Sequence, residues 1–192
     1  MLKFLANILQ LIISPQKGWE DLEDDDYRTD GRRGAIDIRR LYTSCFIPVI
    51  LICSLTSFIR IMYDGGPDFL EALQMAIIEF FSLFLSYHLA VYIFSAAMPR
   101  IFSDDVYPDQ RREAIMVLYS ISVIALIFLL GNVIKVRIAL IQLLPFYVVF
   151  IIWKGARFIG VPERNIGFFM IMASLAVLGS VYGLNFLFNF LL

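Results

Sequence analysis

The positive charges of this chain are confined to a few short segments. Seven of its sixteen Lys and Arg residues lie in residues 1–40, and the others fall in gaps between long apolar runs. The stretch from Asn165 to Leu192 carries no charge of either sign. With 60% hydrophobic residues and a mean hydropathy of +0.78, a chain of 192 residues has too much apolar surface for one soluble core. We therefore predict an all-α integral membrane protein.

Five apolar segments are long enough to cross a bilayer as helices, since spanning about 30 Å of hydrocarbon takes about 20 residues. Helices are expected because lipid offers no water to satisfy an open strand edge. A membrane barrel would need alternating strands, and these segments do not alternate. The five predicted spans cover residues 41–62, 77–98 (with Phe69 as an earlier possible start), 114–133, 136–153 and 166–192.

The basic residues also predict how the chain is threaded. Residues 1–40, 99–113 and 154–165 hold seven, three and three of the sixteen Lys and Arg residues. The other three lie in the gaps on the opposite side, at Arg60, Lys135 and Arg137. Because cytoplasmic loops are enriched in Lys and Arg, we expect a cytoplasmic N-terminus. Five spans then place the C-terminus outside.

Residues 1–14 are predicted to form an interfacial amphipathic helix. Lys3, Asn7 and Gln10 share one face at helical spacing, and twelve residues, from 2 to 13, are too few to span. Ser14 ends the helix because a residue before proline avoids the helical region. A signal peptide is the alternative. We disfavour it because no small-x-small cleavage site follows and Pro15 comes directly after the apolar run.

Residues 15–40 form a charged cytoplasmic segment ahead of a transmembrane domain over residues 41–192. Within it, an acidic stretch from Glu20 to Asp26 precedes a basic stretch from Arg28 to Arg33. A solvated loop is the simplest interpretation. The alternative is a docking site for a basic partner or a cation.

One span carries polar residues near the middle of the bilayer. His88, the only histidine, follows Ser86 and Tyr87. One interpretation is a neutral imidazole bonded to a neighbouring span, worth about 0.6 kcal/mol. The other is a proton- or ligand-handling group in a small aqueous cavity, lined also by Ser86, Tyr87 and Gln142. Glu79 falls on the opposite helix face and near the outer interface, so we do not pair it with His88.

No catalytic or metal-binding pattern is evident. A single histidine excludes a paired-histidine metal site, and there is no Gly-x-Ser-x-Gly elbow, phosphate loop or pair of acidic residues in mid-span. Cys45 and Cys53 would lie about 12 Å apart on one helix, too far for a disulfide. We expect no enzymatic activity, no cofactor, no metal and no nucleic-acid partner.

Proline, tryptophan, tyrosine and glycine residues at particular places along the chain form a recognisable pattern. The N-terminal apolar helix is followed by Pro15 and then Trp19, and Tyr119 begins a Tyr-Ser pair early in the third span. Tyr147 and Gly155 complete the pattern in and after the fourth span. Together with the five spans, these residues resemble the bacterial branch of the Yip domain family, the Ypt/Rab-interacting membrane proteins.

The resemblance implies a non-enzymatic protein that scaffolds a protein partner or organises membrane lipid. It makes the five motif residues partner-binding or structural, and the short chain favours a bacterial cytoplasmic membrane. Residues 121–123 depart from the family, since many members have a proline there. The expected partners are lipid and a protein on the cytoplasmic face, and the topology permits a homo-oligomer without requiring one. The alternative function is a small transporter or channel with a polar site around His88.

Overall fold

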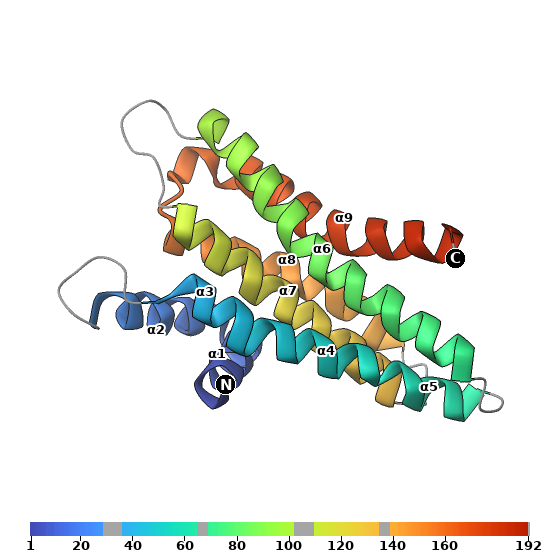
Figure 1. The fold of residues 1–192 in the computed structure, drawn as a ribbon. Helices are drawn as coiled ribbons and strands as arrows, with labels where there is room; N and C mark the ends of the chain where they lie inside the picture. The colour runs from blue at the N-terminus through green and yellow to red at the C-terminus, as the bar shows by residue number, and fades with distance from the viewer. Residues whose placement is uncertain (29–35, 65–68, 102–109, 135–138, 192) are drawn as a thin grey trace.

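The structure, a computed structural model, describes residues 1–28, 36–64, 69–101, 110–134 and 139–191. Every regular element in these ranges is a helix. Two short helices, α1 (Leu2–Ile13) and α2 (Pro15–Arg28), pack at one end of a bundle of longer helices that run alternately in opposite directions (Figure 1). The bundle contains α3 (Ile38–Leu41), the π-helical turn η1 (Tyr42–Phe46), α4 (Ile47–Leu55), α5 (Ser57–Asp64), α6 (Phe69–Ile101), α7 (Gln110–Val133), α8 (Ala139–Ile159), the 3₁₀ turn η2 (Glu163–Asn165) and α9 (Ile166–Leu191).

The long apolar helices make this chain an integral membrane protein. Within the described ranges, four stretches are long and apolar enough to span a bilayer: Ile38–Arg60, Phe69–Pro99, Gln110–Val133 and Glu163–Leu191. They coincide with four of the five predicted spans, and α6 begins at the earlier of its two predicted starts. The remaining predicted span, 136–153, overlaps α8, a helix of 21 residues that packs against α2, α7 and α9.

The first of these stretches is interrupted at several points along its length. Asp37 caps its start, because its side chain accepts hydrogen bonds from the backbone N–H groups of Arg39 and Arg40. The π-helical turn η1 comes just before Pro48, which has no N–H to donate to the preceding turn. Helix α4 ends before Thr56, whose hydroxyl donates to the carbonyl of Cys53 at 2.6 Å, and α5 begins after it. These breaks divide the stretch into α3, η1, α4 and α5.

Helix α7 lies at the centre of the bundle. All of its residues from Glu113 to Ala125 are buried, and it packs against α4, α5, α6 and α8. A helix that is apolar on all sides is expected at such a position. Among the described residues the most extensive helix–helix contact joins α6 to α9, where the rings of Phe94 and Phe169 meet edge to face with centroids 6.0 Å apart. Large apolar side chains such as Phe190, 79% exposed, face outward, as expected of a surface in contact with lipid.

The N-terminal segment differs from the predicted loop. Residues 15–28 form α2, although Asp and Gly are weak helix formers. Pro15, Trp19, Leu22 and Asp26 recur at helical spacing and are buried on one face, and α2 packs against α8. Tertiary packing of this face therefore outweighs the low helix propensity of the acidic stretch. Helix α1 ends at Ile13, as the Ser14-Pro15 pair predicted.

Helices α1 and α2 lie close together at Gly18. A Cβ atom placed there would lie 2.9 Å from the backbone nitrogen of Leu11 and 3.0 Å from its Cα. Only a residue without a side chain fits at this distance. The same pair of helices is joined at its exposed edge by an ion pair between Lys3 and Asp25 at 3.0 Å.

We therefore expect Gly18→Ala to push α1 away from α2. The clash is with backbone atoms, which cannot rotate aside, and overpacking of this kind typically costs about 1–3 kcal/mol. Hydrogen–deuterium exchange should become faster in residues 2–28 and stay slow in α7. Gly167→Ala is the matched control, because a Cβ there meets nothing within 4 Å. Unchanged exchange in residues 2–28 of Gly18→Ala would contradict the close crossing.

Candidate functional site

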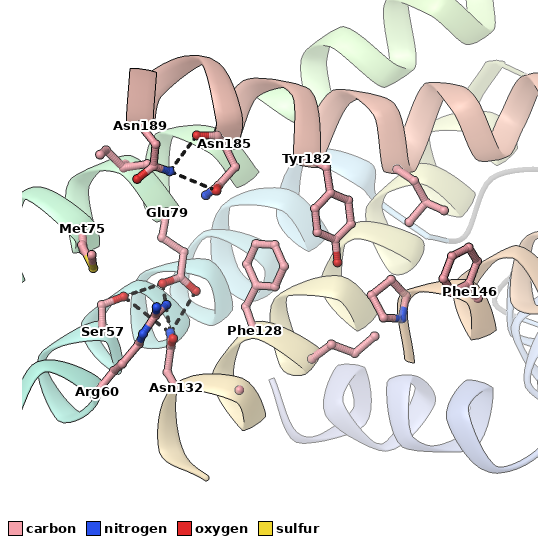
Figure 2. A pocket seen from close by; sticks show the side chains of 15 residues that line it. Ser57, Arg60, Met75, Glu79, Phe128, Asn132, Phe146, Tyr182, Asn185 and Asn189 are labelled. Carbon is pink, nitrogen blue, oxygen red and sulfur yellow. Dashed lines mark hydrogen bonds between the residues drawn. The ribbon is translucent and has the colours of Figure 1, made fainter. Parts of the chain in front are cut away.

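A cluster of polar side chains lies inside the bundle where α4, α5, α6 and α7 meet (Figure 2). Its centre is Glu79 of α6, which is 7% exposed. Asn132 Nδ2 donates to both carboxylate oxygens, at 3.2 Å to Oε1 and 3.0 Å to Oε2. Cys53 Sγ donates to Oε1 at 3.3 Å, and the Ser57 hydroxyl donates to Oε2. These four residues are called the Glu79 cluster below.

Both carboxylate oxygens of Glu79 lie within hydrogen-bond distance of these side chains. The donors are neutral groups, an amide, a hydroxyl and a thiol. Burying a carboxylate away from water costs several kcal/mol, and hydrogen bonds to its oxygens offset part of that cost. An ionisable residue kept inside a membrane bundle in this way indicates a candidate functional site.

Three residues of the Glu79 cluster, Ser57, Glu79 and Asn132, line a pocket of about 810 Å³ (Figure 2). Arg60, Asn185 and Asn189 add polar groups to its lining. Asn189 Nδ2 donates to the backbone carbonyl of Asn185 at 2.8 Å and to its Oδ1 at 3.1 Å, so the two amides are held together. The volume is in the range of about 300–1,000 Å³ that is typical of small-molecule sites. The rest of the lining is mostly apolar: Met75, Ile78, Ile127, Phe128, Gly131, Pro145, Phe146, Leu178 and Tyr182.

Sequence reasoning missed this site because it placed Glu79 at the outer interface, where ionisation costs little. In the structure its side chain points into the protein. One signal was available. Cys53 and Ser57 are four residues apart, and in the structure both bond to Glu79. The asparagine from α7, however, is brought to the carboxylate only by the fold.

The predicted polar site around His88 is arranged differently. His88 is exposed on the opposite side of α6 from Glu79, as predicted, and its Nε2 lies 3.0 Å from the hydroxyl of Tyr42. Ser86 bonds back to its own helix, and Tyr87 is buried. None of these three residues lines the pocket described above. The side chain of Gln142 lies outside the described residues, so a site formed by all four stays a prediction.

The residues that carried the family resemblance lie together at the other end of the bundle. The indole N–H of Trp19 donates to the carbonyl of Ile151 in α8 at 2.9 Å. A Cβ atom at Gly155 would lie 3.0 Å from the Trp19 ring and 3.1 Å from the sulfur of Met116. Gly155 therefore lets the indole lie directly against α8.

The other three motif residues surround this contact. Tyr119 packs edge-on to Trp19, with ring centroids 6.4 Å apart, and its hydroxyl accepts from Asn7 at 3.3 Å. The hydroxyl of Tyr147 donates to the carbonyl of Ile12 at 2.8 Å, which joins α8 to α1. Pro15 begins α2 and is buried. The structure thus places all five motif residues where α1 and α2 dock on α7 and α8.

Charged residues hold the same interface from its outer edge. Asp26 pairs with both Arg111 and Arg112 at the start of α7. Arg112 also contacts Glu23 at 3.4 Å and donates to the carbonyl of Phe158 at 2.9 Å. Part of the acidic stretch is therefore used inside the protein, and the prediction of a solvated loop is wrong for residues 15–28.

Comparisons with protein-family models, with curated proteins and with solved structures give no match for this chain. Two features of the molecule itself bear on its function. One is the pocket beside the Glu79 cluster, and the other is the docked pair of N-terminal helices.

We expect the Glu79 cluster to show strong coupling between Glu79 and Asn132. Asn132→Leu should lower the thermal stability of the detergent-solubilised protein by about 1–3 kcal/mol, because it leaves the buried carboxylate with fewer donors. Glu79→Leu/Asn132→Leu should lose less than the sum of the two single variants, since both partners of the bond are removed together. Ser180→Ala serves as control, because its hydroxyl bonds within α9 to the carbonyl of Val177. Additive losses would contradict the coupling.

Proposed function

We propose that this chain is a non-enzymatic multi-pass membrane protein of the Yip type with five spans, in which α8 crosses the membrane as well as the four stretches named above. Helix α8 starts at the end of the bundle where α7 stops and leads back to the end where α9 starts (Figure 1). That path supports a full crossing. With the distribution of Lys and Arg, it supports a cytoplasmic N-terminus and an external C-terminus. The membrane proposed is a bacterial cytoplasmic membrane.

The proposed role is to scaffold a protein partner or to organise lipid through the N-terminal unit, which consists of α1 and α2. The observation that carries this proposal is the outward face of α1. Leu2, Leu9 and Ile13, which recur along one side of the helix, are 87%, 54% and 78% exposed. A helix with an apolar stripe, placed at the cytoplasmic end of a membrane bundle, is suited to lie at the interface between lipid head groups and acyl chains.

The outward face of α2 supports a protein partner. Glu20, Asp21 and Asp24 are exposed on it, while Asp26 is occupied by arginines of α7. These three carboxylates suit a basic segment of a partner. The unit is held to the bundle by the Trp19–Ile151 hydrogen bond, so its surface is preorganised and loses little freedom on binding.

The proposed five-span topology predicts on which side of the membrane each loop lies, and fusions to alkaline phosphatase can check this. This enzyme needs an oxidising compartment for its disulfides. A fusion after Leu192 should be active, and a fusion after Gly160 should be inactive, because one span separates these points. If α8 did not cross, the topology would change by one span, and the fusions after Val133 and Gly160 would report the same side. That outcome would contradict five spans.

The surface of α2 makes a second prediction, for protein extracted in polymer-bounded lipid discs and analysed by mass spectrometry. We expect one protein near equal stoichiometry, lost in Glu20→Lys/Asp21→Lys/Asp24→Lys because the charge complementarity is reversed. Glu163→Lys, at another exposed acid, is the control and should retain it.

A lipid-organising role would appear in the same preparation as one enriched lipid. That enrichment should be lost in Leu2→Ser/Leu9→Ser/Ile13→Ser, because the apolar stripe is removed while the buried face of α1 is kept. The proposed role is wrong if neither set of substitutions changes the proteins or lipids that co-purify.

A further inference from the structure

We propose that the pocket beside the Glu79 cluster binds the head group of a zwitterionic phospholipid that has a primary ammonium, of the phosphatidylethanolamine class. The site is separate from the N-terminal unit and does not depend on its proposed role. It lies between α5, α6, α7, α8 and α9.

The polar part of the pocket matches both charges of such a head group. Glu79 supplies a carboxylate whose oxygens already accept from Cys53, Ser57 and Asn132, so it contributes electrostatic attraction to an ammonium. The amide oxygens of Asn185 and Asn189 supply acceptors for the N–H groups of the ammonium. Arg60 lines the same pocket, and a guanidinium with five N–H donors is well suited to phosphate. Carboxylate and guanidinium in one lining indicate a ligand that carries both signs of charge.

The apolar part of the pocket matches the rest of a lipid. Phe128 and Tyr182 meet edge to face with ring centroids 5.7 Å apart, and Pro145 and Phe146 continue the lining along α8. Phe146 is 69% exposed, so this side of the pocket opens at the outward surface of the bundle. In a membrane that surface faces acyl chains. A head group held near Glu79 can therefore leave its chains in the bilayer.

The chemistry also predicts which head groups bind weakly. An anionic head group without an ammonium, such as that of phosphatidylglycerol, would bring its charge close to Glu79 in a medium of low dielectric constant. The trimethylated ammonium of phosphatidylcholine has no N–H to donate to the carboxylate or the amides. The primary ammonium is favoured over both.

The test is native mass spectrometry of the purified, delipidated full-length protein, titrated with these three lipids carrying identical chains. Gly131→Leu blocks the pocket, because Gly131 lines it and a Cβ there meets nothing within 4 Å. Gly179→Leu is the matched control, since Gly179 is equally open but does not line the pocket. Both changes replace a helix-interior glycine and gain helix propensity, so neither should unfold its helix.

We expect the wild-type protein to bind phosphatidylethanolamine about tenfold more tightly than either other lipid. Gly131→Leu should lose about tenfold in this affinity, and Gly179→Leu should keep it. Glu79→Gln should lose the preference over phosphatidylcholine, because the neutral amide no longer attracts an ammonium. Thermal unfolding checks that each variant is folded. If Glu79→Gln is not folded, the comparison of Gly131→Leu with Gly179→Leu tests the proposal.

Three results would overturn the proposal. The first is equal binding of the three lipids, and the second is unchanged phosphatidylethanolamine binding in Gly131→Leu. The third is full competition by water-soluble phosphoethanolamine at the same concentration as the lipid, which would make this a solute site.

Discussion

Inside this bundle a buried polar group can take its hydrogen bonds only from the protein, because lipid offers none. The carboxylate of Glu79 meets that constraint through donors from three other helical segments. At the opposite end, the indole N–H of Trp19 and the hydroxyl of Tyr147 reach backbone carbonyls of neighbouring helices. These bonds connect elements far apart in sequence, and they set how the helices are placed around the buried helix α7.

The two ends of the molecule have different chemistry. The end that holds α1 and α2 is closed by aromatic packing and by the ion pairs of Asp26 with Arg111 and Arg112. The Glu79 end keeps a pocket open between helices. A closed, preorganised surface suits a partner or a membrane surface, whereas an open pocket with both signs of charge suits a ligand. The two proposals therefore concern separate parts of one protein.

The candidate sites could be predicted from the sequence only in part. Pro15, Trp19, Tyr119, Tyr147 and Gly155 were selected by resemblance, without any geometry, and the structure brings all five to one interface. Glu79 was noticed but judged to be at the membrane interface. Its burial depends on a hydrogen bond from Asn132, which lies 53 residues away in the chain. No local sequence pattern predicts that contact.

The sequence by itself determined the helical membrane class, the approximate limits of the long apolar helices and the end of α1 at Ile13, because hydrophobic length and proline act locally. Tertiary structure decided that the acidic residues 15–28 form a helix, since the face of Trp19 and Leu22 gains its burial only by packing against other helices, α8 among them. It also decided that Glu79 points inward while His88 points outward. Apolar residues surround both positions in the sequence, so only the placement of neighbouring helices distinguishes a buried face from one that meets lipid.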